Sequence, residues 1–174
     1  IENKLYTVLK FLKNQQEITQ DKAKKESIHI LYNNSIVNLM YFVHSRKNDI
    51  DSVKYYTKLV DSIATDYDTK SRAYATLGYA YQSVGNHVEV IRNFIKSIDL
   101  NNKSNYAKKG VNEIWSLLDL ADYYIRFQGF EHSDKVLSVV EYKLKMLKDE
   151  EDYKELYFYF CLSKASSLAK KSNC

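Results

Sequence analysis

Proline is absent from the 174-residue sequence and glycine occurs only 4 times, whereas an average chain of this length would contain about nine prolines. Tight turns depend heavily on these two residue types. Their shortage argues against β-sandwiches and β-barrels, which join many short strands by such turns, and it favours helices connected by short polar links. The length suits a single helical domain covering residues 1–174.

Cysteine is also scarce, and long apolar runs and a strong charge excess are missing. Cys161 and Cys174 provide neither a disulfide framework nor a zinc set, which predicts a reducing, cytoplasmic location. No apolar run reaches the roughly 18 residues of a membrane span. The chain begins at Ile1 with neither Met nor a leader, so we expect a fragment of a longer protein. The net charge of +4 reflects 26 Lys and Arg residues against 22 acidic residues, and the Lys residues are dispersed among the acids, which gives no indication of nucleic-acid binding.

Motifs of catalysis and cofactor binding are missing too. The sequence has no G-x-x-x-x-G-K, G-x-G-x-x-G or G-x-S-x-G segment. No two histidines are four residues apart, as a helical metal site requires; they are His29, His44, His87 and His132. We therefore predict a protein that is not an enzyme and holds no metal or cofactor. Cys161 is expected to be a small buried hydrophobic residue.

Apolar residues recur at steps of three and four along the whole chain, which predicts amphipathic helices. The predicted helices cover residues 5–12, 28–43, 53–63, 74–84, 88–98, 106–127, 133–147 and 153–169. Asp49, Asn86 and Asp149 are positioned to cap the helices that follow them. The 16 tyrosines are expected mainly in the core and between helices.

One segment, residues 71–102, carries a repeat motif. Its spaced residues are Tyr74-x-x-Leu77-Gly78-x-x-Tyr81, then Gly85 in the turn, then Val90-x-x-x-Phe94. This pattern resembles the tetratricopeptide repeat. We expect Gly78 to let two helices approach closely, and Gly85 to adopt a left-handed conformation after the first helix.

Degenerate copies flank this segment, from Met40 to Thr57 and from Leu120 to Val140, and the helices at both ends look like half-units. A single helix pair cannot bury both of its faces, so such pairs must stack. The resemblance implies an all-α, tetratricopeptide-like α-solenoid of about eight helices, or about four helix pairs, with an extended concave groove.

A narrower resemblance covers residues 51–100 and 117–165. It is carried by Val53-Lys54-Tyr55-Tyr56-Thr57-Lys58, Tyr74-Ala75-Thr76-Leu77-Gly78, Asn93-Phe94-Ile95-Lys96-Ser97-Ile98 and the stretch from Asp119 to Leu137. These segments are similar to the C-terminal half of bacterial peptide-sensing regulators, nearest to the arbitrium-peptide receptor family of temperate Bacillus phages. The resemblance implies a transcriptional regulator of lysis and lysogeny. Its helix-turn-helix DNA-binding domain would lie in a missing N-terminal part, while this half binds a short peptide and controls dimer geometry.

The site residues are assigned from the repeat register. The family's peptide-holding Asn and Arg residues match positions where their identity is not retained: Phe42, Arg46, Asp68 and Tyr79. In a tetratricopeptide unit the first helix lines the groove. This register assigns a ligand-binding set of Asn38, Phe42, Arg46, Arg72, Tyr79, Ser83, Asp122 and Arg126. Its mixture of aromatic, amide and guanidinium groups suits an extended peptide and its carboxylate.

Three functions remain open at this stage. The first is a regulatory domain that binds a short peptide or a protein segment in its groove. The second is a structural protein-protein interaction scaffold that has no small ligand, and the third is a peptide-controlled phosphatase-binding module. For each, the last helix is a candidate homodimer surface through Leu156, Phe160 and Leu168. DNA would be a partner only through the missing N-terminal part, and no membrane partner is expected.

Overall fold

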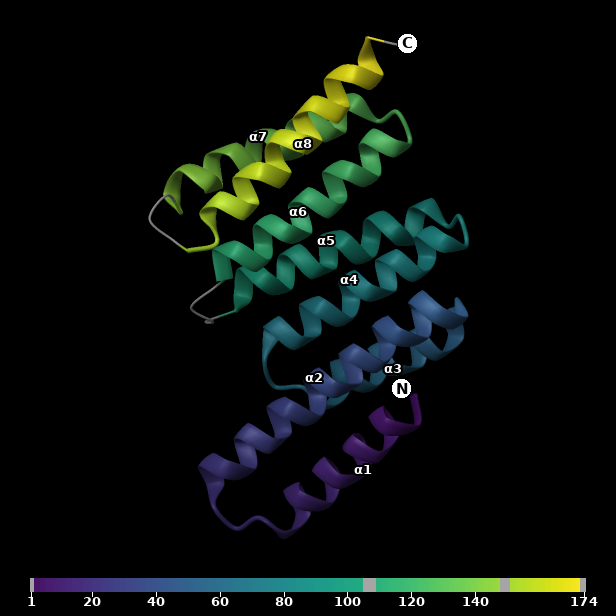
Figure 1. Ribbon diagram of the computed structural model, residues 1–174, viewed down its shortest axis with the longest axis vertical. Coiled ribbons are helices and arrows are strands. Elements are labelled where there is room, and N and C mark those ends of the chain that lie inside the picture. The colour runs from purple at the N-terminus through teal and green to yellow at the C-terminus, as the bar shows by residue number, and fades with distance from the viewer. Residues whose placement is uncertain (1, 105–108, 148–150, 173–174) are drawn as a thin grey trace. The chain divides into compact units, whose positions relative to one another are not determined.

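The computed structural model describes residues 2–104, 109–147 and 151–172, and every regular element in those ranges is an α-helix (Figure 1). The helices are α1 (Glu2–Ile18), α2 (Lys22–Lys47), α3 (Ile50–Ile63), α4 (Tyr67–Ser83), α5 (His87–Lys103), α6 (Lys109–Arg126), α7 (Phe130–Met146) and α8 (Tyr153–Lys171). The all-α prediction is confirmed, and each predicted helix corresponds to one of these. The start of the predicted sixth helix, 106–108, and the proposed cap Asp149 lie outside the described residues.

The chain divides into two compact units, Ile1–Leu100 and Asn101–Cys174. In the first unit, α1 packs on α2, α3 packs on α2, and α4 packs on both α2 and α3. In the second unit, α6, α7 and α8 pack against one another (Figure 1). Over the ranges that the structure describes, no helix combines the length and the hydrophobicity that crossing a membrane requires.

The core of the first unit is built from the apolar stripes that the sequence periodicity predicts. On α2 the fully buried side chains recur at steps of three and four residues, and on α3 they recur seven residues apart. They include Ile36, Leu39, Met40, Val43, Val53 and Val60. Complete burial of one such side chain stabilises the folded chain by about 1.5–3 kcal/mol. This stripe therefore fixes which faces of α2 and α3 remain for other contacts.

Hydrogen bonds between α2 and α4 reveal a repeat register. They join Asn34 to Thr69 and Arg72, and the α2 cap Asn48 to Ser83, across separations of 35 to 38 residues. The partner numbers rise together along both helices, so α2 and α4 run parallel, one repeat apart. We call α2, α4, α6 and α8 the first helices, and α3, α5 and α7 the second helices.

The α4–α5 pair contains the two glycines singled out from the sequence. A Cβ atom built on Gly78 would lie 2.9 Å from Cε1 of Phe94, a fully buried ring on α5. Gly85 has a φ of 72°, which is the left-handed conformation. Both expectations are confirmed. Ser71 donates its hydroxyl to the carbonyl oxygen of Ser97 at 3.0 Å, and together with the Gly78 contact this makes α4 and α5 antiparallel.

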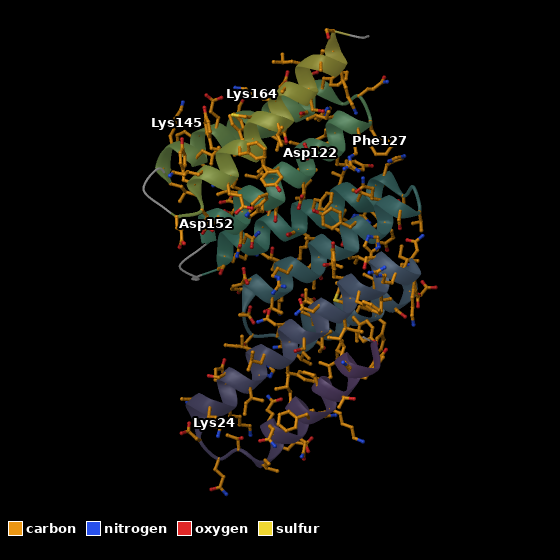
Figure 2. All side chains as sticks on the ribbon, viewed as in Figure 1. Lys24, Asp122, Phe127, Lys145, Asp152 and Lys164 are labelled. Atoms are coloured by element: carbon orange, nitrogen blue, oxygen red, sulfur yellow. The ribbon has the colours of Figure 1, made fainter. Side chains whose placement is uncertain are left out.

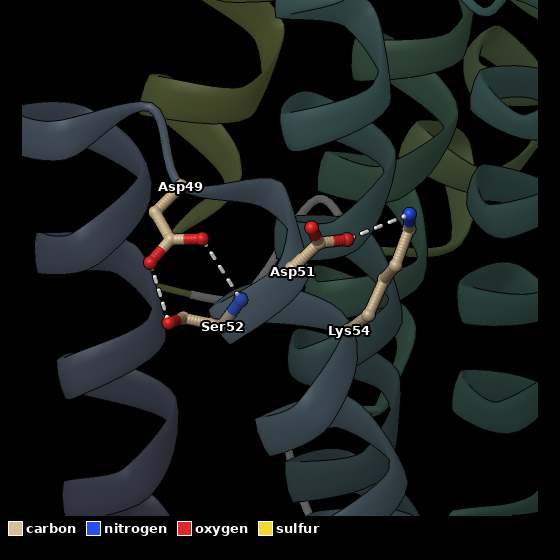
Figure 3. A network of polar contacts seen from close by, with 4 residues as sticks. All are labelled: Asp49, Asp51, Ser52 and Lys54. Atoms are coloured by element: carbon tan, nitrogen blue, oxygen red, sulfur yellow. Dashed lines mark hydrogen bonds and ion pairs between the residues drawn. The ribbon is translucent and has the colours of Figure 1, made fainter.

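The start of α3 shows how the links cap the helices (Figure 3). The Asp49 carboxylate accepts hydrogen bonds from the backbone N–H of Ser52 at 3.0 Å and from its hydroxyl at 2.6 Å. The Ser52 hydroxyl, followed by the Ser52 amide, lowers the pKa of the Asp49 carboxyl group. One turn further on, Lys54 pairs with Asp51 at the surface, 3.1 Å apart. Asn86 caps α5 in the same way, so both described caps are confirmed.

Within the second unit, α6 and α7 are also an antiparallel pair. Lys143 of α7 pairs with Glu113 of α6 at 2.7 Å, and Gly110 of α6 lies against Leu147. The residue numbers of these contacts fall along α6 as they rise along α7, so the two helices are antiparallel. Asp122 of α6 accepts a hydrogen bond from Ser163 of α8, 41 residues later. In each unit, helices that follow one another directly are therefore arranged as pairs, and successive first helices are neighbours.

Candidate functional site

In the first unit, the predicted residues Asn38 and Arg72 meet across the α2–α4 contact. Arg72 donates to Oδ1 of Asn34 at 2.9 Å and to Oδ1 of Asn38 at 3.4 Å. The Thr69 hydroxyl donates to the same Asn34 oxygen at 3.4 Å. The guanidinium is thereby held between two amides on the exposed face of the first helices. Amide and guanidinium groups in this arrangement match the carbonyl and N–H groups of an extended peptide.

The other predicted residues of this unit lie along the same two helices. Phe42 is half-buried, and Arg46 is exposed with no ion-pair partner among the described residues. The ring of Tyr79 makes an edge-on contact with Phe94, with 5.2 Å between ring centroids, so it belongs partly to the α4–α5 packing. Ser83 donates to Oδ1 of Asn48 and joins the C-terminal ends of α4 and α2.

The second unit has a groove of about 320 Å³ between the first helices α6 and α8. Its lining residues are Asp122, Ile125, Arg126, Tyr159, Leu162, Ser163, Ser166 and Lys170. Two of these, Asp122 and Arg126, belong to the predicted set, and Figure 2 labels Asp122 on α6. The groove therefore gives these two residues a defined concave setting.

Three zones follow one another along this α6–α8 groove. At one end lies the lining residue Tyr159, whose ring makes an edge-on contact with Trp115 of α6, with 5.0 Å between ring centroids. In the middle, the Ser163 hydroxyl donates to Oδ1 of Asp122 at 2.7 Å. At the other end lie Arg126, the last residue of α6, and Lys170, in the last turn of α8. The zones are aromatic, polar and cationic in that order.

The cationic end carries surplus positive charge. Arg126 and Lys170 are both exposed, and neither has an ion-pair partner among the described residues. The only acidic residue in the lining is Asp122, which already accepts from Ser163. Cations are also favoured at helix C-termini by the helix dipole. This end of the groove is thus electrostatically suited to an anionic group such as a carboxylate.

The two units contribute unequally to the predicted site. Asn38 and Arg72 are joined by a hydrogen bond between α2 and α4, and Ser83 makes a separate bond to Asn48. Phe42, Arg46 and Tyr79 lie on these same helices. Asp122 and Arg126 share the separate α6–α8 groove. The expectation that all eight residues line one concave surface stays a prediction.

Sequence reasoning missed the contribution of α8. The predicted set contains no residue of this helix, yet it supplies Tyr159, Ser163, Ser166 and Lys170 to the groove. A signal was present, because the apolar spacing of α6 recurs in α8 with an offset of 40 residues. Asn34 and Thr69 of the α2–α4 network were missed as well, since their pairing depends on how the two helices align.

Two expectations about α8 are wrong. Cys161 is exposed, and not a buried hydrophobic residue. Leu156 and Phe160 are buried, so neither is available as a dimerisation residue, whereas Leu168 is 65% exposed. The reason is the register of the helix: its buried stripe runs through Leu156, Phe160, Ser163 and Ser167, and Cys161 lies about 100° around the helix from Phe160.

The tyrosines are less buried than expected. Tyr123 is buried, whereas Tyr41, Tyr55 and Tyr142 are each at least 60% exposed. The exposed rings lie off the apolar stripe of their helices, where they add contact surface without filling the core. Burial raises the pKa of the Tyr124 hydroxyl, which is half-buried near the α6–α7 turn.

Two of the histidines, His29 and His44, are half-buried in the first unit. His29 contacts the Gln16 amide at 2.8 Å and the Ile63 carbonyl oxygen at 3.0 Å, and so links α1, α2 and α3. His44 has a buried Nδ1 atom without a hydrogen-bond partner, and burial lowers its pKa. Within the described residues, no three His, Cys, Asp or Glu side chains are grouped so that they could hold a metal ion.

Comparisons with known proteins add no relative to this description. No family model, curated protein or solved structure matches the chain.

Proposed function

We propose that the chain is the ligand-binding and dimerisation domain of a phage or bacterial cytoplasmic transcriptional regulator. It would form a tetratricopeptide-like α-solenoid that binds a short peptide or protein segment through its first helices. The regulator class and the link to lysis and lysogeny rest on the resemblance of residues 51–100 and 117–165 to arbitrium-peptide receptors. The cytoplasmic assignment rests on the scarcity of cysteine in the sequence, which contains only Cys161 and Cys174.

The observation that carries this proposal is the α6–α8 groove. At one end of this groove lies Tyr159, in contact with the Trp115 ring. At the other end lie Arg126 and Lys170, which have no ion-pair partner among the described residues. A peptide with an apolar side chain and a free C-terminal carboxylate matches these two ends. Arg126 would bind the carboxylate with two parallel hydrogen bonds while Lys170 contributes a point charge. Trp115 and Tyr159 would contact the apolar side chain.

The unique tryptophan makes this proposal measurable without a label. Trp115 is the only Trp of the chain and contacts the groove residue Tyr159. A library of short synthetic peptides, prepared once as free acids and once as C-terminal amides, is titrated while the Trp fluorescence is recorded. We expect some free acids to change the emission saturably and their amides to bind more weakly by roughly tenfold or more, because charge-assisted hydrogen bonds contribute about 1.5–3 kcal/mol.

Substitutions in the groove identify the residues on which the fluorescence change depends. Arg126→Ala and Lys170→Ala should each reproduce the loss seen with the amides. Lys135→Ala is the matched control, because Lys135 is an exposed lysine of the same unit that pairs with Glu131 on α7. If no peptide changes the emission in either form, the alternative of a structural scaffold without a small ligand takes the place of this proposal.

A further inference from the structure

The helix α8 repeats the residue spacing of the two first helices before it. The matching positions are Tyr74, Leu77, Gly78 and Tyr81 in α4, Leu117, Leu120, Ala121 and Tyr124 in α6, and Tyr157, Phe160, Cys161 and Lys164 in α8. The third position is small in all three helices. By this register, α8 presents the packing face of a first helix.

The second helix of each pair covers this small residue in α4 and α6. Gly78 lies against Phe94 of α5, and Ala121 is completely buried in α6, on which α7 packs. Cys161 is exposed. Within the described residues, α8 therefore has the face that receives a second helix but no second helix on it.

A groove follows this uncovered face, between α7 and α8. It consists of two hollows of about 530 and 270 Å³ that share Lys164 and Leu168. Cys161 lines the larger hollow, together with Tyr157. The groove thus runs along α8 for several turns, which is the shape of a seat for a helix.

The α7–α8 groove also carries a charge surplus. Lys145 and Lys164, labelled in Figure 2, both approach Glu141, at 3.8 and 2.9 Å. Further along, Lys171 pairs with Asp134 at 2.5 Å. Three lysines therefore face two carboxylates, and an occupant with acidic side chains is favoured over one with basic side chains.

This charge also argues against a second copy of the chain as the occupant. A symmetric α8–α8 contact would bring the same lysine-rich rims together. The second helices α3, α5 and α7, which have the right apolar pattern, already bury their apolar stripes within their own chain. None of them can be donated to another copy without exposing these buried residues.

We propose that the α7–α8 groove docks an amphipathic helix of a partner protein. The helix packs on α8 as α5 packs on α4. It places a small or β-branched residue and, four residues later, an aromatic residue or Leu against the exposed side chains of Tyr157 and Cys161, with the spacing of Val90 and Phe94 in α5. Acidic residues at its edges face Lys145 and Lys164. This surface is distinct from the α6–α8 groove, so the inference does not depend on the proposed peptide site.

The test uses the chain with Cys174→Ser, so that Cys161 is the only thiol. A Gly-Ser linker joins residue 174 to a copy of residues 129–147, the second helix of the preceding pair, in which Lys143→Glu and Lys145→Glu supply acidic edges. Tethering holds the added helix at a millimolar effective concentration. We expect alkylation of Cys161 by a maleimide to slow by roughly tenfold or more, since the thiol then reacts only when the helix opens. The matched control carries Leu137→Asp in the added helix and should leave the rate unchanged.

Two further measurements separate the outcomes. The added helix should protect equally in an Arg126→Ala background, which disables the peptide site but not this groove. In the untethered chain, Cys161 should react at the same rate at low and high protein concentration. Equal alkylation rates with the added helix and with its Leu137→Asp control would overturn the proposal. Protection that increases with protein concentration would assign the face to a second copy instead, and would overturn it too.

Discussion

Replacing Gly78 by alanine adds one methyl group at the closest approach of α4 and α5. The new Cβ would lie 2.9 Å from Cε1 and 3.0 Å from Cδ1 of Phe94, whereas carbon atoms pack best at about 3.5–4.0 Å. Because Phe94 is completely buried, its ring has little room to withdraw. The added methyl group must therefore separate the two helices or strain the ring.

Two opposing terms determine the size of the effect. Overpacking costs about 1–3 kcal/mol, and the higher helix propensity of alanine returns about 0.8–1 kcal/mol. We expect Gly78→Ala to lower the free energy of unfolding by about 1 kcal/mol, and Gly78→Leu to lower it further. A loss of this size shifts Tm by about 2–4 °C for a chain of this length. Urea unfolding followed by circular dichroism measures it.

The sign of the effect in a second background provides the sharper test. Phe94→Leu removes the ring atoms that Cβ would meet, so Gly78→Ala should become stabilising when it is added to Phe94→Leu. Gly110→Ala is the control for propensity, because its Cβ would meet only the Leu147 side chain, at 3.4 Å or more. A stabilising Gly78→Ala in the wild-type background would refute the close-packing argument and the repeat register built on it.

Two other changes probe polar groups in the interior. Lys143→Met removes the ion-pair partner that lies 2.7 Å from the Glu113 carboxylate, a residue that is 5% exposed. Urea unfolding should show a free energy of unfolding lowered by about 1.5–3 kcal/mol. The control Lys135→Met, at the exposed pair with Glu131, should change it by less than about 1 kcal/mol. Burial lowers the pKa of His44 below its unfolded value of 6.5. As the pH falls below that value, the unfolded chain therefore binds the proton first, and the folded state loses stability. Between neutral and mildly acidic pH, the Tm of His44→Gln should fall less than that of the wild-type chain, and an equal fall in Tm would contradict this role.

The helices could be predicted from the sequence because their signals are local. Apolar spacing and turn residues located every helix of the described residues, and the caps Asp49 and Asn86 follow from residue type and position. Gly78 and Gly85 were predictable for the same reason: a repeat motif ties each to one backbone requirement.

The candidate site could be predicted only in part, because it depends on contacts between helices. Arg72 was assigned, but its partner Asn34 becomes apparent only when α2 and α4 are aligned one repeat apart. Cys161 was placed in the core because it lies in an aromatic stretch, whereas its exposure is set by which helix covers α8. Lys170 was missed because the residues of α8 were not placed in the repeat register.

The central claim is that Arg126 binds the carboxylate of a peptide in the α6–α8 groove. Its most direct test is the Nε–Hε signal of Arg126 in a nitrogen-15 NMR spectrum, assigned with Arg126→Lys and recorded while a fluorescence-active peptide is added. The account predicts that the free acid shifts this signal, that the C-terminal amide does not, and that the signal of Arg92 on α5 stays in place. An Arg126 signal that remains unchanged while Trp115 fluorescence reports saturation would contradict it.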